Sequence, residues 1–210
     1  DLQGVLIDVD PPGLEDATRL VDLLVGPIQP GEYVARHDKV LAARLAAGPS
    51  SQAVTQTLSV KQDASYLITG GCGGLGLAVC RHLIAQGARH LILTSRRGEH
   101  DGVRPTLDTM RDVGVTIEVA KAAVDDLPAM QRLFDECKQA SRPIAGVVHA
   151  AGTSAIEAIQ RMTLEEVTGV LRSKVIGGWN LDRLTRDMSL DFFVLFSSIS
   201  SVWGSAGQSH

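Results

Sequence analysis

The sequence predicts an α/β fold built on a doubly wound parallel sheet, which follows a smaller N-terminal unit. From Ser65 onward, short apolar runs alternate with stretches of helical periodicity, as in sheets whose parallel strands are connected by helices. The apolar runs do not alternate polar with apolar residues, which indicates strands buried on both faces. The first of these runs ends in a turn with five glycines in seven positions, from Gly70 to Gly76.

The N-terminal unit is expected to cover residues 1–50. Its expected elements are a strand over residues 5–9, a helix over residues 14–24 behind Pro11-Pro12-Gly13, and two strands over residues 32–35 and 39–45 that flank a turn at His37-Asp38. The polar segment from Gly48 to Gln52 marks a boundary. We therefore expect residues 51–64 to be a linker and residues 65–210 to form the second unit.

Strands and helices alternate through the second unit. The expected strands cover residues 66–69, 90–94, 115–119, 144–149 and 192–196. The first expected helix follows the glycine turn with Leu75, Val79, Leu83 and Ile84 on its apolar face, and later helices cover residues 103–113, 127–140 and 163–185. Because ligands of such sheets bind beyond the carboxyl ends of the strands, the residues that follow each strand are the candidates for a site.

Composition argues against several classes of function. A net charge of −4 and 21% charged residues give no basis for a nucleic-acid or membrane partner. No signal peptide and no apolar run of membrane-spanning length is visible, so we expect a soluble, cytoplasmic protein. The three cysteines, Cys72, Cys80 and Cys137, share no metal-ligand spacing, so we expect reduced, mostly buried thiols and no metal site.

The glycine turn is a candidate phosphate site. Thr69-Gly70-x-x-x-Gly74-x-Gly76 lies between a strand and a helix, and Gly71, Gly73 and Gly76 also fit Gly-x-Gly-x-x-Gly. Such a turn presents unpaired backbone N–H groups and the positive end of a helix dipole to a pyrophosphate. The alternative is a glycine-rich turn that binds no ligand.

A basic turn follows the second strand. Ser95-Arg96-Arg97 stands where an acidic residue would bind a ribose 2′-hydroxyl, and a guanidinium pairs well with a 2′-phosphate instead. The turn therefore predicts NADPH rather than NADH as the cofactor. The alternative is a solvated basic turn.

Three later positions are candidates with a structural alternative each. The small residues of His149-Ala150-Ala151-Gly152 allow the backbone to lie against a dinucleotide, or they form a tight turn with a capped histidine. A hydroxyl of Ser197-Ser198 is placed to donate to a carbonyl oxygen, or serves as a turn residue. Lys174 lies in the middle of a helix among apolar neighbours and is either catalytic or solvated.

These motifs together resemble the ketoreductase domain of modular polyketide synthases, an extended Rossmann-type member of the short-chain dehydrogenase/reductase superfamily. The resemblance rests on five segments in order: Thr69–Gly76, Ser95–Gly98, His149–Gly152, Lys174–Gly177 and Phe196–Ser198. It implies that residues 1–50 are the end of a degenerate, Rossmann-like structural subdomain that binds no cofactor, and that the remainder is the NADPH-binding catalytic subdomain.

The resemblance also implies roles for individual residues. Lys174 and Ser198 are expected to be catalytic, in reducing a β-ketoacyl group to a β-hydroxyacyl group. The implied partners are an acyl carrier protein, which holds that group on phosphopantetheine, and neighbouring synthase domains. Expected NADPH contacts are Thr69, Gly70, Gly71, Gly73, Gly74, Leu75, Gly76, Ser95, Arg96, Val124, Ala150, Ala151 and Gly152. Ala123 stands where the family has an aspartate near the adenine, so Asp125 either takes a shifted role or, like Asp126, caps a helix.

The sequence departs from the family pattern at its end. The catalytic tyrosine of the family follows Gly-x-x-Gly-Gln-x-x, and here Gly204–His210 brings the chain to its last residue. Neither Tyr33 nor Tyr66 is in a position to replace it. We therefore expect no turnover from these 210 residues alone, and we expect them to be part of a longer polypeptide.

Stereochemistry is also suggested by the resemblance. The sequence has Thr153-Ser154-Ala155-Ile156 where B-type domains carry Leu-Asp-Asp, and Trp203 occupies the position of the A-type tryptophan. With Gln208, Trp203 is expected to orient the substrate in an A-type domain that forms the L-β-hydroxy product; alternatively, Trp203 covers the core. A non-catalytic scaffold module of a megasynthase is the rival function. A free-standing reductase of small ketones would have no need of residues 1–50.

Overall fold

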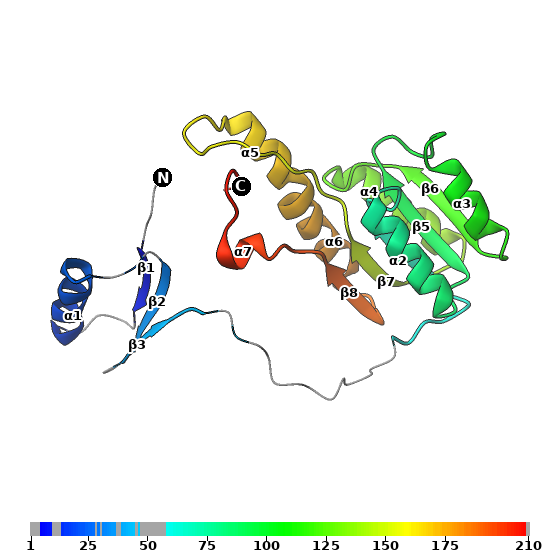
Figure 1. The fold of residues 1–210 in the computed structure, drawn as a ribbon. Helices are drawn as coiled ribbons and strands as arrows, with labels where there is room; N and C mark the ends of the chain where they lie inside the picture. The colour runs from blue at the N-terminus through cyan, green and yellow to red at the C-terminus, as the bar shows by residue number, and fades with distance from the viewer. Residues whose placement is uncertain are drawn as a thin grey trace. The chain divides into compact units, whose positions relative to one another are not determined.

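A computed structural model describes residues 5–9, 14–27, 29, 31–36, 39–44, 46 and 58–208. The chain divides into two compact units, residues 1–56 and 57–210, which are described separately (Figure 1). The predicted turn at His37-Asp38, the segment Gly48–Gln52 and the final Ser209-His210 lie outside the described residues.

The N-terminal unit is a three-stranded sheet with one helix. It contains β1 (Val5–Val9), α1 (Leu14–Val25), β2 (Gly31–Arg36) and β3 (Lys39–Ala42). β1 pairs parallel with β2, and β2 pairs antiparallel with β3. Arg36 ties two strands together through an ion pair of 2.6 Å with Asp8. The predicted elements are confirmed, except that the third strand ends at Ala42.

The second unit is built on a five-stranded parallel sheet. Its strands are β4 (Ser65–Thr69), β5 (His90–Ser95), β6 (Thr116–Lys121), β7 (Ile144–His149) and β8 (Phe192–Leu195). Their order in the sheet is β6-β5-β4-β7-β8, and every pair is parallel. The order reverses between β4 and β7, which makes that position the switch point where ligands of doubly wound sheets bind. The predicted fold class is confirmed.

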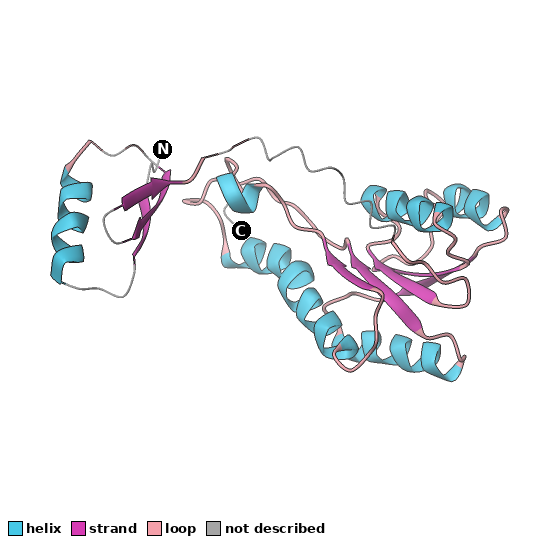
Figure 2. Ribbon diagram, turned by 90° about the horizontal axis from the view of Figure 1, so that it is seen from below, coloured by secondary structure: helices cyan, strands magenta, loops and turns pink. Residues whose placement is uncertain are grey.

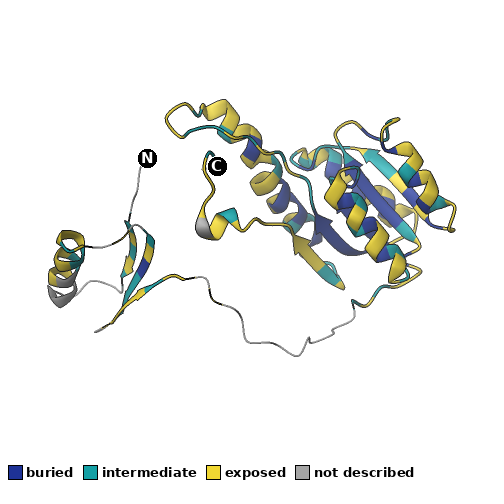
Figure 3. Ribbon diagram, in the orientation of Figure 1, coloured by how far each residue is buried: buried dark blue, intermediate teal, exposed yellow. Residues whose placement is uncertain are grey.

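Helices cover both faces of this sheet (Figure 2). On one face, α2 (Gly74–Ala85) and α3 (Arg104–Arg111) bury Cys80, Leu83 and Leu107 against Tyr66 and Ile68. On the other face, α4 (Leu127–Gln139) and α6 (Gly177–Thr185) share a core with Leu67 and Ile92. Successive residues of β4 thus enter opposite cores, which is why the strand has no polar residue facing water (Figure 3).

The long helix predicted over residues 163–185 is interrupted. α5 (Leu164–Leu171) begins at a capping box in which Thr163 and Glu166 bond to each other's backbone N–H. The next segment, η1 (Arg172–Ile176), is a π-helix, and α6 follows it directly. Lys174 lies at the centre of this wider turn, so the prediction of a continuous α-helix is wrong there.

The first helix of the second unit also differs from expectation. Leu75 was predicted on the apolar face, yet its side chain is 47% exposed, while Gly76, Cys80 and Leu83 face the sheet. α2 begins at Gly74, so Leu75 lies in the first turn and points away from the core. Elsewhere, Cys80 and Cys137 are buried free thiols and Cys72 is partly exposed.

Two kinds of feature are absent from the described residues. No helix among them is long and apolar enough to cross a bilayer. Their His, Cys, Asp and Glu side chains form no cluster of three or more suited to a metal ion. The second unit also contains the short helix α7 (Ser200–Trp203) after β8.

Candidate active site

The glycine turn joins β4 to α2 and leaves backbone donors available. No side chain caps the helix at Gly73, and no acceptor among the described residues bonds the N–H groups of Gly74, Leu75 and Gly76. A Cβ atom at Gly74 would have no atom within 4 Å, so this end of the helix faces open space. The turn therefore has the geometry of an anion site at a helix N-terminus.

Close approach of two loops explains the need for glycine at position 70. Gly70 has a φ of +65°, and a Cβ atom there would lie 2.7 Å from the Cα of Ala151. The turn after β4 and the loop after β7 are thus in contact at the switch point. Any side chain on Gly70 would separate them.

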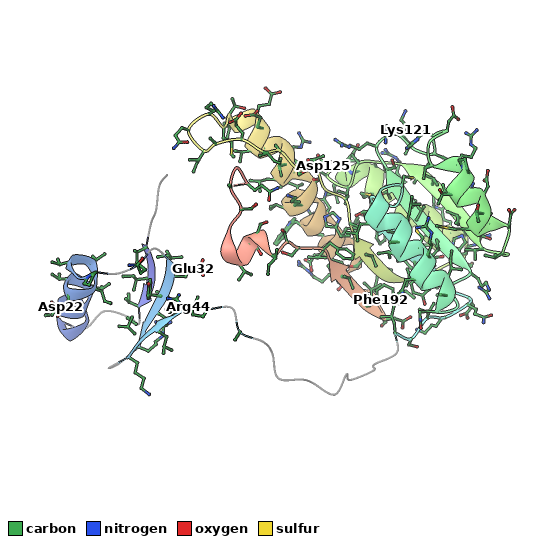
Figure 4. The ribbon with its side chains drawn as sticks, in the orientation of Figure 1. Asp22, Glu32, Arg44, Lys121, Asp125 and Phe192 are labelled. Carbon is green, nitrogen blue, oxygen red and sulfur yellow. The ribbon has the colours of Figure 1, made fainter. Side chains whose placement is uncertain are left out.

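A group of three cations surrounds the end of β5. Arg96 and Arg97 are exposed in the turn that closes with a 3.1 Å hydrogen bond from the Gly98 N–H to the Ser95 carbonyl. Lys121 pairs with Ser95 in the β5–β6 register, and its stem lies against Gly98 (Figure 4). We call Arg96, Arg97 and Lys121 the basic cluster.

The basic cluster has no acidic partner among the residues that the structure describes. The nearby Glu99 carboxylate is bound to Arg111 at 2.7 Å, and this contact lowers the pKa of Glu99. Lys121 has no local signal in the sequence, because only the pairing of β5 with β6 brings it beside Ser95.

The loop after β6 is held by contacts within the protein. Asp126 caps α4 by accepting a 3.0 Å bond from the Ala129 N–H, which confirms the capping prediction for this residue. Asp125 is not a cap but pairs with Arg172 at 2.8 Å (Figure 4). The buried Asn180 donates to the Val124 carbonyl at 3.0 Å, so this carbonyl is engaged inside the protein.

The loop after β7 is fixed by Thr69, which is fully buried. Its carbonyl accepts from the Ala150 N–H at 3.1 Å, and its hydroxyl accepts from the Ala151 N–H at 3.3 Å. The hydroxyl also lies 2.6 Å from Nδ1 of His149. Thr69 therefore stabilises the loop after β7 through hydrogen bonds, and its side chain is buried in the protein interior.

A cavity of about 770 Å³ lies at the carboxyl ends of β7 and β8. Lys174 and Ser198 both line it, together with Ala151, Gly152 and Gln208. The Lys174 stem passes over Gly152, where a Cβ atom would lie 3.7 Å from the lysine Cε. The structure thus brings both predicted catalytic residues to one cavity, beside the loop that contacts the glycine turn.

The orientation of Ser198 is set by its neighbours. Its hydroxyl oxygen accepts a 3.1 Å hydrogen bond from the Ser200 N–H, which leaves the hydroxyl proton available to donate. The Ser200 hydroxyl in turn donates to Oε1 of Gln208 at 3.3 Å. Trp203 ends α7, but its side chain lies outside the part of the chain that the structure describes.

A family model and the similar curated proteins indicate the same family for this chain. The family model described as "KR domain" matches residues 64–210. The chain is 42% identical over 160 residues to erythronolide synthase EryA2 of Saccharopolyspora erythraea, and 38% identical over 156 residues to squalestatin tetraketide synthase clz2 of Cochliobolus lunatus. These alignments cover 74% and 73% of this chain but only 4% and 6% of the two synthases.

Solved structures give the same result. A structure described as A-type ketoreductases from a modular polyketide synthase matches with a TM-score of 0.80 and 37% identity, over 98% of this chain and 44% of that one. PlmKR1, the ketoreductase from the first module of phoslactomycin biosynthesis in Streptomyces sp. HK803, matches with a TM-score of 0.79 and 36% identity, over 97% and 47%. The chain therefore belongs to the KR domain family, the ketoreductase domains of polyketide synthases.

Proposed function

We propose that this domain binds NADPH and reduces a β-ketoacyl group, carried on an acyl carrier protein, to a β-hydroxyacyl group. The observation that carries the proposal is the meeting of three features at one sheet edge. These are the unpaired N–H groups of the glycine turn, the basic cluster and the cavity that contains Lys174 and Ser198.

The residues at this edge fit the parts of NADPH in turn. The N–H groups of Gly74, Leu75 and Gly76 suit the pyrophosphate, and the loop Ala150–Gly152 offers a close backbone surface to the nicotinamide side. The basic cluster suits the 2′-phosphate, because no carboxylate among the described residues pairs with its positive charges. An acidic residue, as required by NADH, is absent from this turn.

Bound NADPH would supply the hydride that reduces the ketone carbon. The Ser198 hydroxyl would donate a hydrogen bond to the ketone oxygen as negative charge develops there, and the proton that completes the alcohol would come from the tyrosine expected in this family. The Lys174 ammonium, which lines the same cavity, would lower the pKa of that tyrosine and support the return of its proton. Removal of one hydrogen-bond donor to a developing negative charge typically lowers the rate by a factor of about 10²–10³.

The similarity to large polyketide synthases supports the proposed partners. We infer an acyl carrier protein that presents the substrate on phosphopantetheine, and neighbouring synthase domains in the same assembly. Similarity to structures described as A-type and A1-type ketoreductases supports an L-β-hydroxy product, with Gln208 and Trp203 orienting the substrate.

Calorimetric titration of the chain with NADPH and NADH tests the cofactor proposal. We expect NADPH to bind at least about tenfold more tightly, since one charge-assisted contact supplies about 1.4 kcal/mol or more. Gly70→Ala should abolish binding, because its methyl group would strike Ala151. Gly169→Ala, at a position with nothing within 4 Å, is the matched control. No binding of wild type at millimolar NADPH would favour the non-catalytic scaffold module.

A further inference from the structure

The His149 side chain is buried between the glycine turn and the helix that carries Lys174. It ends β7 and is 4% exposed. Its ring packs against Gly177, where a Cβ atom would lie 3.4 Å from the imidazole Cε1, and it lies near Gly178. The imidazole therefore contacts Thr69 at the end of β4 and Gly177 directly after η1.

One ring nitrogen has a defined partner. Nδ1 lies 2.6 Å from the Thr69 hydroxyl, which already accepts from the Ala151 N–H. If Nδ1 carried a proton, the Thr69 hydroxyl proton would have no acceptor among the described residues, at a cost of about 1–3 kcal/mol. The hydroxyl therefore donates to Nδ1, and the ring proton is on Nε2.

The other ring nitrogen faces the π-helix. Nε2 is fully buried and has no hydrogen bond of standard geometry within the described chain. Burial lowers the pKa of His149 below its usual value, while the nearby carbonyls of Ser173 and Lys174 raise it in part. Those carbonyls belong to η1, where the Gly177 N–H is shared between the carbonyls of Arg172 and Lys174. The His149 ring thus lies against the junction at which α6 follows η1 directly.

We propose that His149 is a positioning residue for Lys174: as the neutral Nε2–H tautomer, it connects the Thr69 hydroxyl to the backbone of Ser173 and Lys174. The resulting chain of donors runs from the Ala151 N–H through Thr69 and His149 to η1. It holds the π-helix in the register that places the Lys174 stem over Gly152, inside the cavity. Only the role of Lys174 in this inference rests on the proposed function.

The tautomer is measured on the wild-type chain by ¹⁵N NMR of the histidine rings at pH 7.5. The inference requires the His149 Nδ1 signal to be that of an unprotonated, hydrogen-bonded nitrogen, and Nε2 to be protonated. A proton on Nδ1, in either the other tautomer or the imidazolium, would overturn it. This measurement needs no variant and no cofactor.

The positioning of Lys174 is measured by its rate of acetylation in a short pulse, read by peptide mass spectrometry. Thr69→Val removes the hydroxyl donor and should change the Lys174 rate by about two- to tenfold, the equivalent of one hydrogen bond. Thr69→Ser keeps the donor and should restore the wild-type rate. Lys138, on the remote α4, should label equally in all three proteins.

An unchanged Lys174 rate in folded Thr69→Val would refute the positioning role. If Thr69→Val does not fold, the wild-type tautomer still decides whether the donor chain exists. Neither readout uses NADPH, so a chain that binds no NADPH would contradict the proposed function while the His149 result stands or falls by itself.

Discussion

We expect Arg96, Arg97 and Lys121 to set the cofactor preference of the domain. Each is exposed, and none forms an ion pair within the described ranges, so their combined charge is available to a ligand. By contrast, the nearby Arg111 forms ion pairs with Glu99 and Asp108. A 2′-phosphate carries nearly two negative charges. These three cations should therefore bind NADPH, which has this group, more tightly than NADH, which lacks it.

Arg96→Ala should therefore weaken NADPH binding by about tenfold and leave NADH binding within about twofold, because only NADPH carries the 2′-phosphate. Lys121→Ala should have a smaller effect in the same direction, of about threefold, since an ammonium forms no bidentate pair. Both effects should decrease in high salt, as expected of exposed charges. Calorimetric titration with each cofactor measures them.

Arg132→Ala is the matched control, because this arginine is exposed on α4 and its removal changes net charge equally. If Arg132→Ala weakens NADPH binding as much as Arg96→Ala, general electrostatic attraction accounts for the effect. The basic cluster would then not be the 2′-phosphate site.

His149 should also give the second unit a specific sensitivity to acid. Burial holds its pKa below the ordinary 6.5, so the unfolded chain takes up a proton at a higher pH than the folded chain. Stability that is fully present above pH 6.5 is therefore lost as the pH falls through the lowered folded pKa. Each unit of lowering corresponds to about 1.4 kcal/mol.

Urea unfolding of wild type and His149→Gln between pH 7.5 and pH 5 isolates this contribution. The free energy of unfolding of wild type should fall more steeply than that of the variant, because glutamine does not titrate. Parallel curves for the two proteins would show that the buried imidazole is protonated equally in both states.

At the scale of elements, Gly177 has no room for a side chain where α6 follows the π-helix. A Cβ atom at Gly177 would lie 2.6 Å from Cγ1 of Val124 and 3.4 Å from the His149 ring, so alanine there must displace η1 or the loop after β6. Gly177→Ala should lower the free energy of unfolding by about 1–3 kcal/mol through overpacking. It should also reduce NADPH affinity, and both are measured by urea unfolding and titration.

Gly169→Ala provides the comparison within the same helical segment. No atom lies within 4 Å of the added methyl group in α5, so the better helix propensity of alanine should raise stability by about 0.4–1 kcal/mol. Equal effects of the two substitutions would mean that the packing of Gly177 does not matter.

Much of this element structure was predictable, for identifiable reasons. The buried strands are apolar runs bounded by turn residues, and Thr163 and Asp126 are helix caps with recognisable neighbours. The π-helix was not predictable, since residues 172–176 carry no local pattern that distinguishes it from a continuous α-helix. The prediction that Leu75 lies on the apolar face of α2 was wrong because hydrophobic periodicity does not show at which residue a helix begins.

At the scale of the whole molecule, the sequence predicted that residues after the strands would lie together, but not how these segments are joined. Parallel strands place all their carboxyl ends at one edge, so Gly70, Ser95, His149 and Ser198 were expected to converge. The contacts that hold these segments together come from residues with no local signal in the sequence. Thr69 bonds to His149, Asn180 donates to the Val124 carbonyl, and Lys121 pairs with Ser95. Each requires knowledge of which strands are neighbours.

The edge strand β8 should determine whether the 210-residue chain self-associates in solution. Among the described strands, β8 pairs only with β7, and Phe193, Val194 and Leu195 are 37%, 39% and 51% exposed. An apolar edge strand with unpaired backbone groups favours association between chains. We expect reversible self-association that increases with concentration and is measured by sedimentation velocity.

Val194→Lys should reduce this association, because a charged side chain on an edge strand opposes pairing with a second edge. Its thermal stability should stay close to that of wild type, since the position is already exposed. Val113→Lys, at a residue that is 64% exposed outside the sheet, adds the same charge and should associate as wild type does. A chain that stays monomeric at all concentrations, or equal association of the two variants, would mean that β8 is not the surface through which the chains meet.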